Sequence, residues 1–314
     1  MTFGMEQIEK VVEAIKNEQL LHTDTTVIGD NSSGKSLLLR QFIELISEER
    51  LVYFIDAVNR GFDVKKIPKE PYLVTYRPEL LKTRLREDYF NLKDSFNCFG
   101  TWTERIEGIY EAYEERLQEL FEKMTGESFQ IDSQSVLGEV KFKEGNALLS
   151  TGYQAMVRLI LELLYYETEV KAKEVEKAWV VIDEIDEFLS PRYAARIVPF
   201  LRKEFPWAKW LMATHSSDLV AAISDANLVL LDNNMCEVLD SNDYASLPEV
   251  QIIFERLFGN VPKQNDQVDK LLRCLLNNKM NHLWGTKDEK VLEDLQKKQL
   301  SASQRLIVRQ IQNW

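Results

Sequence analysis

A loop rich in glycine and serine is the first group of residues whose types and spacing can do chemistry. Gly29 to Ser36 has the spacing GxxxxGK[ST], follows the apolar run Thr25–Ile28 and opens a helical pattern. Glycines allow a tight turn in which backbone N–H groups and a helix N-terminus face phosphate oxygens. Lys35 can then reach the β and γ phosphates, and the Ser36 hydroxyl can bind Mg²⁺. The loop therefore predicts an ATP site, with contacts from Gly29, Asp30, Asn31, Ser32, Ser33, Gly34, Lys35, Ser36 and Leu37.

Two carboxylates follow the most apolar run of the chain. Residues 178–182 lead directly into Asp183 and Glu184, and the carboxyl end of a buried parallel strand lies at the edge where α/β sheets bind ligands. We expect Asp183 to be a metal ligand and Glu184 to orient or deprotonate an attacking water. Acidic residues also begin helices without binding anything, but the upstream loop favours the catalytic interpretation. Asp186 and Glu187 are interpreted as solvated or interface charges.

Two further segments carry candidate site residues. The apolar run 210–214 ends in His215, which can reach the same sheet edge and sense the γ-phosphate. The segment 149–154, Leu-Ser-Thr-Gly-Tyr-Gln, precedes an apolar helical pattern. Ser150 and Gly152 at a helix start can bind an anion, although an ordinary N-cap serine looks the same. His22 and His282 have no such context, so we expect them to be structural or surface residues.

The hydrophobic periodicity predicts an α/β fold with a mostly parallel sheet. The expected strands are 25–28, 51–56, 72–75, 178–182, 210–214 and 227–231, and the expected helices are 5–21, 37–47, 155–166 and 192–205. In the second helix the predicted core face is Leu38, Phe42, Leu45 and Ile46. The chain is predicted to have four divisions. They are the half of the core that contains the glycine loop at 1–78, a helical insertion at 79–135, the second half of the core at 136–239 and a helical C-terminal region at 240–314.

Composition limits the classes of partner. The net charge of −12 argues against a surface that binds nucleic acid as a whole, although local basic patches remain possible. Cys98, Cys236 and Cys274 are far apart, so we expect neither a zinc knuckle nor a disulfide framework. The N-terminal segment is acidic and no apolar run approaches about 20 residues. We therefore expect a soluble cytoplasmic protein that does not bind membranes.

In this order the four motifs resemble the ABC-type ATPase family, specifically its soluble SMC-like and RecF-like branch, which includes ATPases of bacterial anti-phage systems. The resemblance covers about residues 24 to 232. It implies that Gly29 to Ser36 is Walker A, that 149–154 is the LSxGxQ signature, that 180–184 is Walker B with Glu184 as catalytic glutamate, and that His215 is the switch histidine. It further implies that two monomers sandwich two ATP molecules, with Ser150 and Gly152 of each completing the other's site.

The resemblance implies a regulatory ATPase that dimerises on ATP and restrains or releases a separate effector, such as a nuclease or toxin, in anti-phage defence. Two alternatives stay open. One is a RecF-like DNA-repair ATPase that clamps duplex DNA, using basic residues that are interleaved with acidic ones: Arg40, Lys65, Lys66, Lys82, Arg84 and Arg86. The other is a P-loop kinase or a nucleotide-gated assembly module without hydrolysis.

Overall fold

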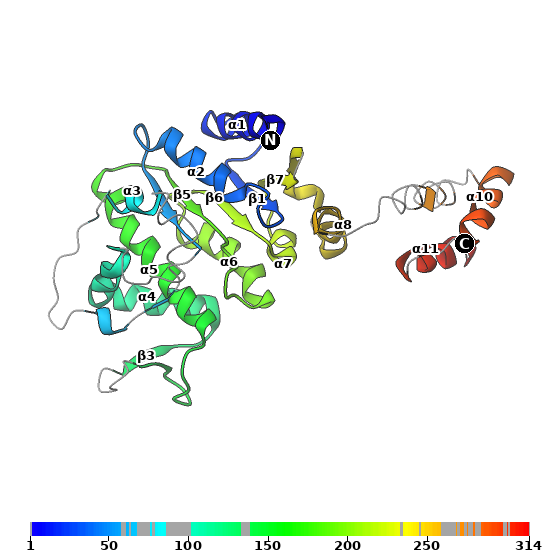
Figure 1. The fold of residues 1–314 in the computed structure, drawn as a ribbon. Coiled ribbons are helices and arrows are strands. Elements are labelled where there is room, and N and C mark those ends of the chain that lie inside the picture. Colours follow the sequence, from blue (N-terminus) through cyan, green and yellow to red (C-terminus); the bar gives the residue numbers. More distant parts are fainter. Residues whose placement is uncertain are drawn as a thin grey trace. The chain divides into compact units, whose positions relative to one another are not determined.

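Six strands form the central sheet of the computed structural model, in the order β2-β5-β6-β1-β7-β8 (Figure 1). The first five are parallel, and β8 pairs antiparallel with β7. The strands are β1 Asp24–Gly29, β2 Val52–Ile55, β5 Ala178–Ile182, β6 Ala208–Thr214, β7 Ala226–Asp232 and β8 Met235–Asp240. The structure describes residues 2–57, 61–62, 64–67, 76, 79–85, 102–132, 139–232, 235–244, 246–258, 268, 271–272, 275, 279, 284–297, 300 and 302–313.

The helices surround this sheet and also build a separate C-terminal part. They are α1 Thr2–Lys16, α2 Lys35–Ile46, α3 Glu79–Leu85, α4 Tyr110–Thr125, α5 Thr151–Ala172, α6 Pro191–Glu204, α7 Ser217–Ala221, α8 Leu247–Phe258, α10 Thr286–Gln296 and α11 Ala302–Asn313. The chain divides into two compact units, Met1–Leu257 and Phe258–Trp314. No helix in the described part of the chain combines the length and apolar composition needed to cross a bilayer.

The sheet is buried on both faces. Trp179 and Val181 of β5 pack with Phe42 in the core beneath α1 and α2, whereas Val180 and Ile182 join the core formed with α4, α5 and α6. Figure 1 shows these two helical layers on opposite sides of the strands. A strand covered on both faces needs apolar residues at every position. This is why β5 reads as a continuous apolar run rather than an alternating one.

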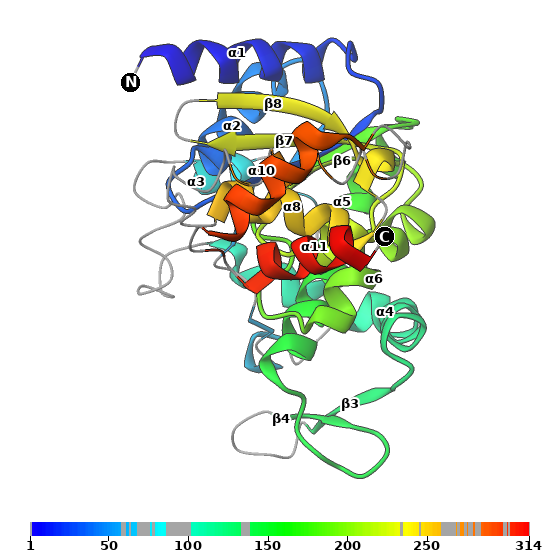
Figure 2. The ribbon, with the colours of Figure 1, turned by 90° about the vertical axis from the view of Figure 1, so that its right-hand side faces the viewer.

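Most of the predicted elements are confirmed, and the differences have identifiable causes. Leu45 was placed on the core face of its helix but is 39% exposed, because Leu39 and Ile43 take that place in the core. The antiparallel hairpin of β3 Phe129–Asp132 and β4 Glu139–Phe142 was not predicted. Figures 1 and 2 show it at the end of the first unit opposite α1. The predicted strand 72–75 lies outside the described residues.

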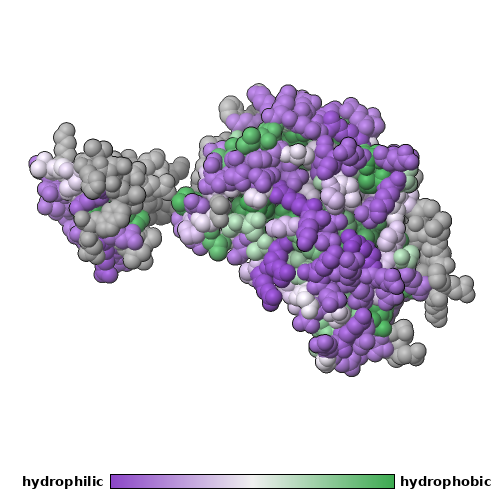
Figure 3. Space-filling view, turned by 180° about the vertical axis from the view of Figure 1, so that it is seen from behind, coloured by the Kyte–Doolittle hydropathy of each residue, from purple (hydrophilic) through white to green (hydrophobic). Residues whose placement is uncertain are grey.

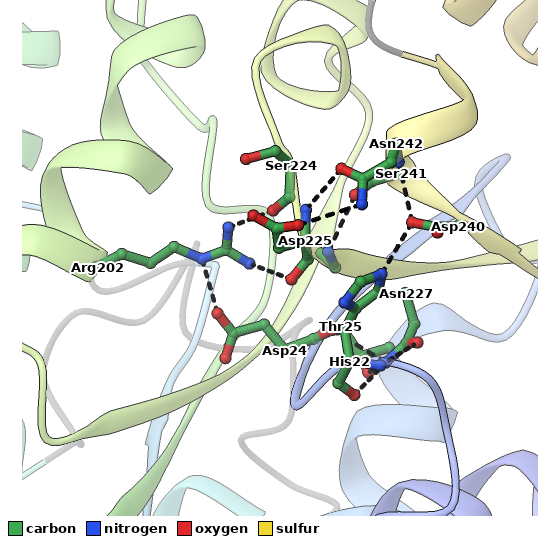
Figure 4. A network of polar contacts seen from close by, with 11 residues as sticks. His22, Asp24, Thr25, Arg202, Ser224, Asp225, Asn227, Asp240, Ser241 and Asn242 are labelled. Atoms are coloured by element: carbon green, nitrogen blue, oxygen red, sulfur yellow. Dashed lines mark hydrogen bonds and ion pairs between the residues drawn. The ribbon is translucent and has the colours of Figure 1, made fainter.

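A polar network fixes the start of β1 at the amino end of the sheet (Figure 4). The Asp24 carboxylate accepts from Arg202 Nε of α6 at 2.7 Å and from the backbone N–H of Trp210 at 3.0 Å. Asn227 Nδ2 donates to the carbonyls of His22 and Asp24 at 2.7 and 3.1 Å. These bonds join β1 to β6, β7 and α6.

The same network contains one of the three histidines of the chain. His22 Nε2 lies 2.9 Å from Asp240 Oδ1 of β8, and the His22 backbone N–H donates to Asn227 Oδ1 at 3.1 Å. The prediction of a structural or surface role for His22 is therefore confirmed. His282 lies outside the described residues.

A buried ionic network ties the segment after β2 to α5. Arg84 Nη2 donates to both oxygens of Glu162 at 2.9 Å, and Tyr53 donates to Glu162 at 2.5 Å. Arg158 donates to Glu162 at 2.9 Å and to Glu107 at 2.6 Å. Burial disfavours the Glu162 carboxylate, but the two guanidinium groups hold its pKa below the ordinary value.

This network corrects one sequence interpretation. Arg84 was named among the basic residues that could contact DNA, but it is 2% exposed. Its guanidinium is committed to Glu162 and to the carbonyl of Phe54. Removing one partner from a buried pair leaves an uncompensated charge in the core. Arg84 therefore belongs to the structural core and is not available to a phosphate backbone.

Candidate nucleotide-binding site

The predicted phosphate loop is a tight turn between β1 and α2. A Cβ on Gly29 would lie 2.3 Å from Ser33 Oγ and 2.5 Å from the carbonyl oxygen of Leu231, so a larger residue cannot fit without displacing its neighbours. Gly34 has φ of 104° and Ser32 has φ of 63°, both in the left-handed region. Residues alternating between right- and left-handed conformations turn their N–H groups toward one concave side. The loop thus has the backbone form of an anion-binding nest.

The remaining loop residues stabilise this turn. The Ser33 N–H donates to the Asp30 carbonyl at 3.1 Å, and the Asn31 N–H donates to Asp30 Oδ1 at 2.7 Å. Leu37 follows in the first turn of α2 and is 37% exposed.

Lys35 lies inside the loop at the first position of α2. Its ammonium donates to the carbonyls of Gly29 and Asp30, each at 3.0 Å, and the residue is 6% exposed. Burial lowers the pKa of Lys35, and the nearby carboxylates of Asp183 and Glu184 partly oppose this shift. An ammonium held by two carbonyls of the glycine loop suits a polyphosphate ligand.

Ser36 and Asp183 meet although 147 residues separate them in sequence. Ser36 Oγ donates to Asp183 Oδ2 at 2.7 Å, and Asp183 is 1% exposed. Neighbouring oxygen ligands of an octahedral Mg²⁺ lie about 2.9 Å apart, so this hydroxyl and carboxylate have the spacing and the donor type that the ion requires. The residues fit the predicted metal. Among the described residues, no group of three His, Cys, Asp or Glu side chains could hold a metal without help from a ligand.

Glu184 and His215 lie at the same edge of the sheet. His215 Nε2 is 3.7 Å from Glu184 Oε1, and the two side chains are 29% and 35% exposed respectively. Glu184 has φ of 48°, so the backbone turns sharply after β5. Both side chains are partly exposed, although His215 Nε2 itself is buried.

A contact that the sequence analysis did not identify holds this edge together. Thr214, the last residue of β6, donates through Oγ1 to Asp186, and the Ser216 N–H donates to the same Thr214 oxygen at 3.0 Å. The Ile185 N–H donates to the carbonyl of Ala213 at 3.0 Å. Asp186, interpreted as a solvated or interface charge, is therefore a structural link between the segments that carry Glu184 and His215.

The segment 149–154 makes contacts with other parts of the chain. Ser150 has an extended backbone at the start of α5, and a Cβ on Gly152 would lie 2.4 Å from the carbonyl oxygen of Phe188. Phe188 itself has φ of 64° and is 54% exposed. No hydrogen bond or ion pair joins 149–154 to residues 29–36, all of which the structure describes. The structure thus brings together Lys35, Ser36, Asp183, Glu184 and His215 but not Ser150 or Gly152.

These features define the class of fold. A glycine loop follows β1, an acidic pair follows β5, a histidine follows β6, and all three strands are parallel members of one sheet. The protein has an α/β fold with a mostly parallel sheet and a glycine loop of the P-loop NTPase type.

Part of the sequence is similar to a Septu protein. No known protein-family model matches it. Over 159 residues the chain is 26% identical to the Septu protein PtuA of Bacillus mycoides (strain KBAB4), a match that covers 47% of this chain and 22% of PtuA. The match therefore spans about a fifth of the length of that relative. This partial similarity is in line with the resemblance that the four motifs suggest.

Similar solved structures have 13–15% sequence identity. The SmcHead bound to the C-winged helix domain of ScpA is 13% identical, covers 69% of this chain and 89% of that chain, and has a TM-score of 0.37. The SMC head domain from Thermotoga maritima is 15% identical, with coverages of 69% and 89% and a TM-score of 0.34. Clostridium perfringens cbiO1, part of the ABC transporter complex cbiONQ, is 15% identical, with coverages of 79% and 88% and a TM-score of 0.35.

The geometry of the loop gives a prediction for Gly29→Ala. The added methyl group collides with Ser33 Oγ and the Leu231 carbonyl, so the loop must move and its amides lose their common direction. We expect the affinity for a fluorescent ATP analogue, measured by titration, to fall at least about tenfold, which corresponds to about 1.4 kcal/mol. Gly61→Ala is the control, because a Cβ there meets nothing within 4 Å. Equal affinities for the two variants would contradict the assignment of the loop.

Proposed function

We propose that this protein binds ATP with Mg²⁺ and hydrolyses it. The observation that carries the proposal is the 2.7 Å contact between Ser36 Oγ and Asp183 Oδ2, which joins the glycine loop to the acidic end of β5. A P-loop NTPase needs a hydroxyl and a carboxylate at one metal position beside the phosphates. The Glu184–His215 pair, 3.7 Å apart at the same edge, supplies the remaining groups.

Each residue has a distinct part in the proposed reaction. The loop amides and Lys35 bind the β and γ phosphates. Ser36 and Asp183 would hold the metal ion, which would neutralise part of the phosphate charge. Glu184 orients the attacking water and accepts its proton. His215 contacts the γ-phosphate and, through its position beside Glu184, limits where that water can lie.

Glu184→Gln tests hydrolysis separately from binding. Glutamine keeps the shape of the side chain but cannot accept the proton, so we expect kcat for phosphate release to fall at least about 100-fold with little change in ATP affinity. Glu187→Gln is the matched control, and its rate should stay near that of the parent. Transfer of phosphate to a small molecule instead of water would identify a kinase, and an unchanged rate for Glu184→Gln would remove Glu184 from the mechanism.

We further propose that two copies of the chain close on two ATP molecules. The support is the placement of Ser150 and Gly152, which have no bond to the loop of their own protomer. A helix start that carries a serine and a closely packed glycine can bind the γ-phosphate held by a partner. Bound ATP then holds the two protomers together, and hydrolysis removes the γ-phosphate contacts between them.

The dimer is tested with Ser150→Arg in the Glu184→Gln background, where ATP persists. The bulky cation blocks the approach of a second protomer, so we expect light scattering with ATP to give a dimer mass for Glu184→Gln and a monomer mass for the double variant. Nucleotide affinity should be equal in both. Dimers that form equally in the two variants would exclude residues 149–154 from the interface.

The proposed role of this ATPase is to restrain or release an effector, such as a nuclease or toxin, in anti-phage defence. Its support is the similarity to a Septu protein. We expect bacteria that express the protein with its neighbouring genes to form fewer phage plaques, and Lys35→Ala to abolish this protection because it removes the phosphate-binding ammonium. Lys171→Gln, at an exposed site, should protect as well as the parent. Full protection by Lys35→Ala would show that protection against phage does not need ATP binding by this protein.

A further inference from the structure

The charge of the chain is divided unequally between the two units. Residues 258–314 contain 10 Lys and Arg against 6 Asp and Glu, a net charge of +4, whereas the whole chain has −12 and the first unit therefore has −16. The basic excess lies in one stretch. Residues 297–314 contain four basic residues, Lys297, Lys298, Arg305 and Arg309, and no acidic residue. The net charge of the whole chain conceals a small cationic unit joined to a strongly acidic one.

Helix α11 presents part of this charge to solvent. Its inner face buries Val308 and Ile311 in the hydrophobic core of the C-terminal unit. Arg305, Arg309 and Gln312 are exposed, and their spacing of four and three residues places them on one side of the helix. The two arginines are about 6 Å apart along the helix axis. The helix, labelled in Figure 2, thus packs with one side and leaves a basic, glutamine-bearing side uncovered within its unit.

The exposed side of α11 is unlike a protein-docking surface. All of its exposed residues that the structure describes are polar: Arg305, Arg309, Gln310 and Gln312. Protein interfaces depend on apolar or aromatic anchors at their centre. Arg305 and Arg309 form no ion pair with any described residue, so their guanidinium donors remain directed at solvent. The first unit of the chain is acidic and would repel a polyanion, so the C-terminal unit is the part whose net charge attracts one.

We propose that the C-terminal unit binds the phosphate backbone of a nucleic acid through the exposed side of α11. Guanidinium groups match phosphate oxygens with paired donors, and glutamine side chains donate to phosphates and sugars. The chain then carries two functional surfaces: the nucleotide edge of the sheet in the acidic unit and a nucleic-acid contact in the basic one. This activity needs no ATP and does not depend on the proposed hydrolysis.

The test is fluorescence anisotropy of labelled oligonucleotides with the full chain, without nucleotide, at 50 to 300 mM KCl. Each phosphate contact contributes about eightfold to duplex affinity at 0.1 M salt and about fivefold to single-strand affinity. R305Q/R309Q should therefore weaken duplex binding about 60-fold and single-strand binding about 25-fold. The slope of log affinity against log salt for the duplex should become shallower by about 1.8.

Two control variants make the result specific. K171Q/K173Q removes the same charge from the exposed end of α5 in the first unit and should change affinity less than about twofold. R305K/R309K keeps both positive charges, on which the counterion contribution depends, and should retain most of the affinity, within about threefold. Circular dichroism melting confirms that each variant is folded.

The proposal is overturned if the parent protein binds neither oligonucleotide at 50 mM KCl, or if R305Q/R309Q matches the parent in affinity and salt slope. Binding of poly-L-glutamate in place of the oligonucleotides would also overturn it and would indicate an acidic protein partner. None of these outcomes depends on ATP turnover, so the results for Glu184→Gln are independent of them.

Discussion

The hydrogen bond between Ser36 and Asp183 is the contact on which the candidate site depends, and the order of strands makes it possible. The loop follows β1 and the acidic pair follows β5, but β6 lies between these two strands. Adjacent strands are about 4.8 Å apart, so the two strand ends are about 10 Å apart. The loop and the first turn of α2 cross the end of β6 to bring Ser36 to the carboxylate. His215, which follows β6, lies at this same edge beside Glu184.

Such a contact needs a rigid sheet, and the structure fixes the sheet from several sides. Apolar side chains cover both faces of the strands, and the bonds of Asp24 and Asn227 hold the start of β1. The network of Arg84 and Glu162 joins the chain after β2 to α5, the helix whose first turn carries Gly152. Because an unpaired charge in the core is costly, this network resists independent movement of the elements it joins. The site therefore rests on supporting contacts that lie outside it.

The division of charge changes what composition implies about partners. A net charge of −12 argues against nucleic-acid binding only if charge is spread evenly over the molecule. Here the acidic first unit and the basic C-terminal unit have net charges of opposite sign. Electrostatic attraction decays within about 8 to 10 Å in physiological salt. A partner close to one surface therefore responds to the charges of that surface and not to the total charge of the chain. The two units of one chain can therefore bind partners of opposite charge.

The sequence by itself determined the local parts of this protein. The glycine loop, the apolar strand ending in Asp183 and Glu184, and the helical periodicities gave the α/β class and most elements, because these signals are carried by neighbouring residues. The tertiary structure decided which parts meet. Strand order placed Ser36 against Asp183, gave Asp186 a structural partner in Thr214, and buried Arg84. It also left Ser150 without a hydrogen bond to the loop. These outcomes depend on pairing between segments far apart in the chain, and no local periodicity specifies which strands become neighbours.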